Sequence, residues 1–221
     1  MSMIPASPVD KVGYYCGRFA PGFFGEPQNS FTNLAFIAGA VFAWYVWRKQ
    51  KDRDRWQLPL FALAGSIGVF SFIFHSVPTR LTLQLDLLPI QLFGLAYLAY
   101  IGRCYLRLSW PALIVLLVGF FLARQLWIGI TPRGALGGGI SHVPAVAGIF
   151  FLGLVLLKRG IGPGRCLIAA GGVYVLALFV RAWDLYLCPV FPFGVHWLWH
   201  ILTALAAGLL IYGIARTPPH K

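Results

Sequence analysis

Two histidines, His196 and His200, lie four residues apart in the stretch GVHWLWHIL near the end of the chain. Residues at this spacing share one face of an α-helix, so both imidazoles should point the same way. A third histidine, His75, closes an earlier apolar stretch, and Asp86 follows it by eleven residues. Three neutral imidazoles with a nearby carboxylate are typical of a zinc site that keeps a fourth position open for water, which indicates catalysis.

The same residues suggest how such a site would hydrolyse a bond. Zinc lowers the pKa of a bound water toward about 7 and polarises carbonyl groups. We expect Asp86 to accept the water proton and pass it to a leaving group. Ser71, one turn before His75, is placed to bond an oxyanion or orient the water, unless its hydroxyl bonds back to its own helix. Haem fits poorly, because two imidazoles one turn apart on one helix cannot straddle a porphyrin.

The sequence around these residues predicts a membrane protein. Of its 221 residues, 59% are hydrophobic and 11% are charged, which is too apolar for a soluble domain. Apolar stretches long enough to cross a hydrocarbon core of about 30 Å recur seven times, with short connections and no internal repeat. We therefore expect an all-α, seven-transmembrane helix bundle in one domain, residues 1–221, with an extramembrane segment over 1–28. The expected helices lie near 30–47, 57–76, 83–101, 109–127, 141–157, 166–183 and 195–214.

The charges predict how the bundle is oriented. The net charge is +12, but the lysines and arginines concentrate in connections between the expected helices, so a nucleic-acid partner is not expected. The densest run, RKQKDRDR, directly follows the first helix, and the positive-inside rule then places the N-terminus outside and the C-terminus in the cytoplasm. His75, Asp86, His196 and His200 all fall within about two turns of the outer surface. Their common depth indicates a single site.

Further polar residues belong to the same outer ends. Glu26, Asn29 and Asn33 form one face at the start of the first helix, with side-chain contacts between them that favour packing over ligand binding. The glycine-rich stretch RGALGGGISH lacks the Lys-Ser/Thr of a phosphate loop and is expected to be a flexible outer loop.

Two pairs of outer residues are placed to interact. Arg181 and Asp184 are three apart at the end of the sixth helix and are expected to pair, with a secondary role in orienting a zinc-binding histidine. Cys16 and Cys188 fall on the outer side, where an oxidising compartment would allow a disulfide that fixes the N-terminal segment over the site. Two free, buried cysteines are the equal alternative.

Taken together, these motifs resemble those of the alkaline ceramidases, members of a superfamily of seven-helix membrane hydrolases that also includes the adiponectin receptors. The resemblance rests on SxxxH (Ser71 and His75), on Asp86, and on HxxxH (His196 and His200). It runs from YYCGRF and EPQNSFTN to HWLWH, and RAWDLYLCP resembles the bacterial members in particular.

The resemblance implies an integral protein of a bacterial inner membrane, with zinc bound by the three histidines on the outer side. Its substrate would be a membrane lipid, and its reaction the hydrolysis of an amide between a fatty acyl chain and a sphingoid base. One departure concerns calcium: the animal enzymes bind it through positions occupied here by Gly17 and Phe19. Of the calcium-binding positions only the one at Glu26 is kept. One carboxylate supplies far fewer than the six to eight oxygens that calcium prefers, so calcium is not expected.

The leading hypothesis is therefore a zinc-dependent intramembrane amidase of ceramide or a related N-acyl lipid. A lipid-binding receptor-like or transport protein with a structural zinc is one alternative. A zinc hydrolase of ester or phospholipid substrates is another, because zinc chemistry acts on many carbonyls. The sequence leaves the oligomeric state open.

Overall fold

The computed structural model describes residues 16–18, 25–132 and 134–219, and this part of the chain is helical and contains no strand. Seven of its helical segments are long and apolar enough to cross a membrane, which confirms the predicted seven-helix fold. The segment expected over 1–28 lies largely outside the described residues, as does Phe19. In chain order the helices are α1 (Pro27–Thr32), α2 (Leu34–Arg48), α3 (Leu58–Ser76), α4 (Arg80–Tyr100), α5 (Trp110–Ile130), α6 (Val143–Lys158), α7 (Gly164–Leu187) and α8 (His196–Arg216).

Local sequence explains where several helices begin. Helices α1, α3, α5 and α6 each carry a proline in the first turn, where its fixed φ suits the helix and its missing N–H leaves no intrahelical bond unmade. Helix α4 begins instead with a capping box in which Thr79 and Thr82 satisfy one another's backbone N–H groups. Helices α1 and α2 form one span with a break at Asn33.

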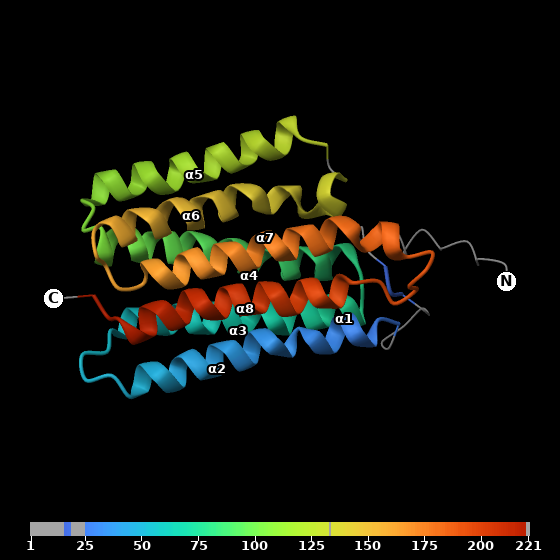
Figure 1. Ribbon diagram of the computed structural model, residues 1–221, viewed down its shortest axis with the longest axis horizontal. Coiled ribbons are helices and arrows are strands. Elements are labelled where there is room, and N and C mark those ends of the chain that lie inside the picture. The colour runs from blue at the N-terminus through green and yellow to red at the C-terminus, as the bar shows by residue number, and fades with distance from the viewer. Residues whose placement is uncertain (1–15, 19–24, 133, 220–221) are drawn as a thin grey trace.

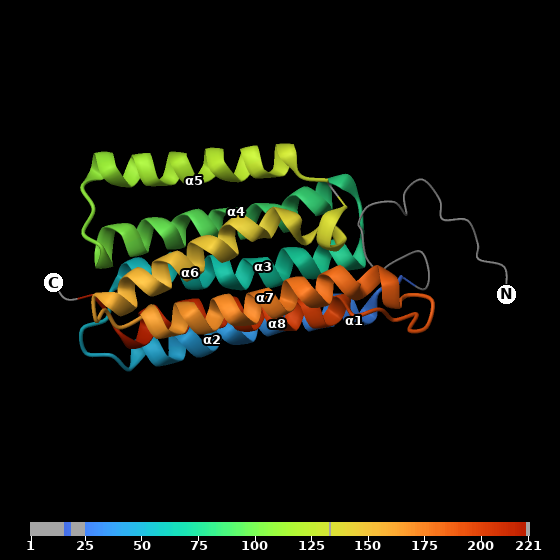
Figure 2. The same cartoon turned by 45° about the horizontal axis from the view of Figure 1, so that its top comes forward.

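Helix α8 occupies the middle of the bundle (Figure 1). Of the 18 consecutive residues that are most apolar in α8, 61% are buried. The corresponding share for α5, at the margin of the bundle, is 6% (Figures 1 and 2). Helix α8 packs against α7 and α2, and α3 packs against α2 and α4, while α1 contacts both α3 and α8. The end of α3 and the start of α8 therefore meet beside α1, at one end of the bundle.

Small residues let the central helices approach closely, as is common in membrane proteins. A Cβ added to Gly39 of α2 would lie 3.6 Å from the Cα of Gly208 on α8. A Cβ on Gly68 of α3 would lie only 2.6 Å from the carbonyl oxygen of Asn33. The backbones of α3 and of the α1–α2 span thus touch directly.

The opposite end of the bundle holds most of the basic connections and a buried polar network. Gln57 is fully buried and donates to the Tyr100 hydroxyl at 2.8 Å and to the Ile214 carbonyl at 2.9 Å. Tyr100 in turn donates to Asp54 at 2.9 Å. These bonds tie the connection before α3 to α4 and α8. The assignment of this end to the cytoplasm stays a prediction from the charges.

The glycine-rich stretch, expected to be a flexible outer loop, forms a short helix that packs on α7, and its flexibility stays a prediction. Residues Ala135–His142 form a 3-10 turn that packs on α7, and the Gly137 carbonyl accepts a hydrogen bond from Arg181 Nε at 2.8 Å. Gly137 has φ +59°, and a Cβ there would lie 2.4 Å from the Arg181 carbonyl oxygen. The glycines are needed because the turn lies so close to α7, so they indicate tight packing.

The close approach at Gly68 generates a stability prediction. Replacing Gly68 with alanine should force the α1–α2 span away from α3 and lower the free energy of unfolding by about 1 to 3 kcal/mol. The matched control is Gly94→Ala on α4, where an added Cβ meets nothing within 4 Å. This control should change stability by no more than about 1 kcal/mol. Thermal unfolding in detergent measures both variants, and equal melting temperatures would contradict the packing described here.

Candidate metal centre

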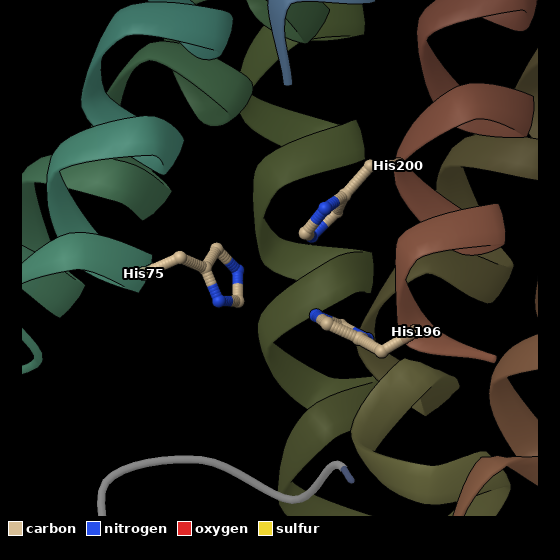
Figure 3. A group of neighbouring side chains, drawn as sticks. All are labelled: His75, His196 and His200. Carbon is tan, nitrogen blue, oxygen red and sulfur yellow. The ribbon is translucent and has the colours of Figure 1, made fainter. Parts of the chain in front are cut away.

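Three buried histidines meet where α3 ends and α8 begins. His75 lies in the last turn of α3, and His196 and His200 lie in the first turns of α8, with exposed fractions of 1%, 4% and 4%. One ring nitrogen from each lies within 4.8 Å of the others. Figure 3 shows His75 facing His196 and His200, with the three rings turned toward one another. The structure thus brings the three predicted ligands together.

The donor set fits a metal ion. Three nitrogens bound at 2.0–2.1 Å to one tetrahedral zinc would lie about 3.4 Å apart, so small ring rotations from the present arrangement would suffice. Imidazole nitrogen suits zinc, copper, iron and nickel, and a set without thiolates or several carboxylates does not favour calcium or magnesium. The group therefore can hold a transition metal ion.

A hydrogen bond fixes which nitrogen of His75 faces this centre. Its Nδ1 lies 2.7 Å from Glu26 Oε2. An ionised carboxylate only accepts hydrogen bonds, so Nδ1 must carry the proton, and the lone pair is left on Nε2. A carboxylate behind a metal-binding histidine orients the ring and makes it a stronger ligand.

The same logic applies to His200. Its Nδ1 lies 3.2 Å from Thr32 Oγ1, and the Thr32 hydroxyl is placed to donate to the Gln28 carbonyl at 2.7 Å. The hydroxyl oxygen then accepts from Nδ1 of His200, which again leaves the lone pair on Nε2. No local signal in the sequence points to Thr32, because its contact with His200 spans 168 residues.

Glu26 is the hub of a buried polar cluster. It has no exposed surface, forms an ion pair with Arg18, and accepts from Asn29 Nδ2 at 3.1 Å. Burial raises the pKa of the Glu26 carboxyl, but its contacts with His75, Asn29 and Arg18 hold it below its ordinary value. Asn33 donates to the Asn29 carbonyl at 2.7 Å, so this face of α1 combines packing with a direct contact to a candidate ligand.

The residues around Cys16 are fastened next to this cluster. Cys16 and Cys188 form a disulfide with Cα atoms 5.9 Å apart. The buried carboxylate of Asp184 accepts the backbone N–H of Cys16 and that of Val195, each at 2.7 Å. These contacts join the N-terminal segment to the end of α7 and the start of α8. They also hold Arg18 near Glu26, a role that no sequence motif signals.

The expected pairing of Arg181 with Asp184 is corrected by these contacts. Asp184 turns toward two backbone N–H groups, while Arg181 lies against His196, with Nη1 3.1 Å from Nε2 of that ring and in closer contact with Nδ1. The Arg181 guanidinium also lies 5.8 Å from the centre of the Trp199 ring. Residues three apart do share a helix face, but backbone donors compete successfully for the carboxylate.

The predicted catalytic residues lie beside the histidines. Asp86 is 9% exposed, and its Oδ1 atom is buried with no hydrogen-bond partner in the described part of the chain. Ser71 lies next to this carboxyl, and His75 and Arg181 are also close to it. An unsatisfied buried carboxylate oxygen is costly, which indicates a place for a water or a substrate group. His142 lies outside the three-histidine group, and its Nδ1 is 2.8 Å from the Tyr174 hydroxyl oxygen.

A groove on the surface of the bundle lies next to Thr32, and none of the three histidines, Asp86 or Ser71 lines it. It has a volume of about 480 Å³, and Thr32, the residue that contacts His200, forms part of its wall. The other lining residues are largely apolar, as a groove for a hydrocarbon chain would require. They are Pro27, Gln28, Phe31 and Trp197.

Neither the models of known protein families nor the curated protein sequences match this chain. The likeness to the alkaline ceramidases therefore stays a prediction carried by the motifs. What the structure adds is the convergence of three histidines, an aspartate and a serine at one end of a seven-helix bundle.

The three-histidine group predicts a defined metal content. Protein purified without chelators should contain about one zinc per chain, and His200→Ala should lose most of it, because two imidazoles bind far more weakly than three. His142→Ala serves as the control, since His142 lies outside the group and its variant should keep the metal. Elemental analysis by mass spectrometry measures both variants. Equal zinc in the two would exclude His200 as a ligand.

The Glu26–His75 contact predicts an effect on affinity. Glu26→Gln keeps the shape of the side chain but removes the charge, and it should weaken metal binding about 10- to 100-fold. Competition with a fluorescent chelator measures the dissociation constant, and circular dichroism checks that the variant is folded. Asp52→Asn, which removes an exposed carboxylate, is the control. An unchanged affinity in folded Glu26→Gln protein would rule out this role.

Proposed function

We propose that this protein is a zinc-dependent intramembrane hydrolase that cleaves the amide of an N-acyl lipid, such as ceramide, to a free fatty acid and an amine base. The observation that carries the proposal is the buried Asp86 carboxyl, with one unpartnered oxygen, beside three buried histidines. A purely structural metal site needs no additional carboxylate that can accept a proton. A catalytic site needs such a group, because a proton must be taken from the water and given to the leaving nitrogen.

The proposal assigns a task to each residue. His75, His196 and His200 would hold zinc, which when bound supplies a Lewis acid for the carbonyl and a water of lowered pKa. Asp86 takes a proton from the attacking water as the water oxygen adds to the carbonyl carbon. It returns that proton to the nitrogen as the C–N bond breaks, so the same group acts as base and then as acid. Ser71 orients the Asp86 carboxyl or donates to the developing oxyanion.

The surroundings support a lipid substrate. The apolar groove that Thr32 borders is open at the surface of a bundle whose helices are long enough to span a membrane. A hydrocarbon chain in the bilayer could lie in this groove while the amide reaches the histidines. The site lies at the ends of the helices, where a polar headgroup also resides. The excess of basic residues at the opposite end supports an outer-side site, and we propose a bacterial inner membrane as its location.

Asp86→Asn tests the proposed reaction. The variant should retain zinc, because Asp86 is not among the grouped ligands, but amide hydrolysis should fall by about 10²- to 10⁴-fold. The assay follows fatty acid release from ceramide and from a membrane lipid extract, using purified protein in detergent. Removing the metal with a chelator should abolish release, and zinc should restore it.

Three outcomes would contradict the proposal or part of it. Zinc-loaded protein that releases fatty acid from no amide would favour a binding or transport protein with a structural metal. Fatty acid release from esters alone would favour an esterase. Full amidase activity in Asp86→Asn would remove the assigned role of the carboxyl while leaving the metal site intact.

A further inference from the structure

A second groove lies on the side of the bundle, between α2 and α3. It has a volume of about 300 Å³, and its walls are aliphatic and aromatic side chains with one glycine. Trp44 of α2 and Leu58 of α3 line it next to the connection between the two helices, and Ile37 lines it farther from that connection. Ile37 and Trp44 are seven residues apart, so the groove extends about 10 Å along α2. Figure 1 shows α2 and α3 joined at the end of the bundle that lies away from the start of α8.

Two arginines lie where this groove meets the connection. Arg48 follows Trp44 by one helical turn, and its guanidinium carbon is 5.1 Å from the centre of the Trp44 ring. Arg55 begins the 3-10 turn Arg55–Gln57, which continues directly into α3. Residues three apart in such a turn lie over one another, so Arg55 precedes Leu58 on the same face. Both arginines are exposed, and the groove therefore has a cation on each helix at this end.

The connection carries a surplus of positive charge. Residues 48–55 include five lysines and arginines and two aspartates. None of these five cations lies within 4 Å of a carboxylate in the described part of the chain. The Asp54 carboxylate instead accepts from the Tyr100 hydroxyl at 2.9 Å and from the backbone N–H of Trp56 at 3.0 Å. An anion from outside the chain would balance this charge.

Aromatic side chains mark the same end as the headgroup region of a bilayer. Trp56 is 75% exposed, and Trp44 and Tyr45 are exposed one helical turn before the end of α2. Tryptophan and tyrosine are enriched at the interface between hydrocarbon and water, where their rings lie at the level of the headgroups. Arg48 and Arg55 then lie at the depth of lipid phosphates, while the groove extends from them into the hydrocarbon layer.

We propose that the groove between α2 and α3 binds one acyl chain of an anionic phospholipid, and that Arg48 and Arg55 bind the phosphate of the same molecule. The planar guanidinium group matches a phosphate in two parallel hydrogen bonds. A zwitterionic phospholipid also carries an ammonium group, which the surplus of cations repels, so the charge selects a lipid that is net negative. Basic pockets between membrane-spanning helices recognise such headgroups. This lipid site lies away from the metal centre and does not rest on the proposed function.

A pair of lipids with the same acyl chains tests the charge selection. The full chain is purified in detergent and stripped of lipid, and native mass spectrometry measures its binding of phosphatidylglycerol and of phosphatidylcholine. We expect one phosphatidylglycerol per chain, bound at least tenfold more tightly than phosphatidylcholine. Equal affinities of the two lipids would overturn the proposal.

A charge-matched pair of variants separates a defined site from diffuse attraction. Arg48→Gln combined with Arg55→Gln should weaken phosphatidylglycerol binding at least tenfold. Lys158→Gln combined with Arg159→Gln is the control, because it removes two exposed cations from the end of α6, which does not line the groove. This control should keep its affinity within about twofold of the unchanged protein. Equal losses in the two double variants would show attraction to the basic end as a whole and would overturn the site.

The acyl chain is tested by filling the groove. Ala62 is exposed and lines it, so Ala62→Phe should weaken phosphatidylglycerol binding at least fivefold while every cation stays in place. Val69→Phe, at an exposed position of α3 outside the groove, should leave binding unchanged. Inorganic phosphate should not displace the lipid, because it brings no acyl chain. Displacement by phosphate, or full binding in Ala62→Phe, would leave an anion site without the groove and overturn the proposal.

A second copy of the chain is the other occupant that the experiment detects. Light scattering in detergent gives the mass of each variant, and a dimer that Ala62→Phe converts to a monomer would make the groove an interface between copies and overturn the proposal. Melting temperatures without lipid should match those of the unchanged protein, because the replaced side chains are exposed. The comparison of lipids and the competition with phosphate need no variant, so the proposal can fail on the unchanged protein alone.

Discussion

The arrangement of the centre depends on the hydrogen bonds behind two imidazoles. A neutral histidine presents one lone pair, and the partner of its other nitrogen decides which atom offers it. Glu26 accepts a hydrogen bond from Nδ1 of His75, and Thr32 accepts one from Nδ1 of His200. Both partners come from the start of the first span, one directly before α1 and the other at its end. This short helix therefore orients two candidate ligands that belong to the second and seventh spans.

These hydrogen bonds require that α1, α3 and α8 pack closely together at one end of the bundle. The central position of α8 and the direct backbone contact at Gly68 bring the three helices together. Asp184 and the Cys16–Cys188 disulfide hold the residues before α1 against α7 and α8, which keeps Arg18 beside Glu26. The polar cluster is thus fixed by packing on one side and by a covalent link on the other.

Much of this could be predicted from the sequence, because apolar length and histidine spacing are local signals. The seven spans follow from hydropathy, and the depth of His75 and His200 follows from helix direction. Tertiary choices could not be predicted in this way: a spacing of three residues does not say that Asp184 will bind backbone N–H groups. Glycines that look like a flexible loop instead make room for Arg181, and Arg18 gives no local sign of its contact with Glu26.

X-ray absorption at the zinc edge reports which atoms surround the ion in the purified protein. We expect three imidazole nitrogens at about 2.0–2.1 Å and one further oxygen or nitrogen ligand. His200→Ala should remove one nitrogen shell or the metal itself. A spectrum dominated by sulfur, or a protein that takes up no stoichiometric metal, would contradict the account.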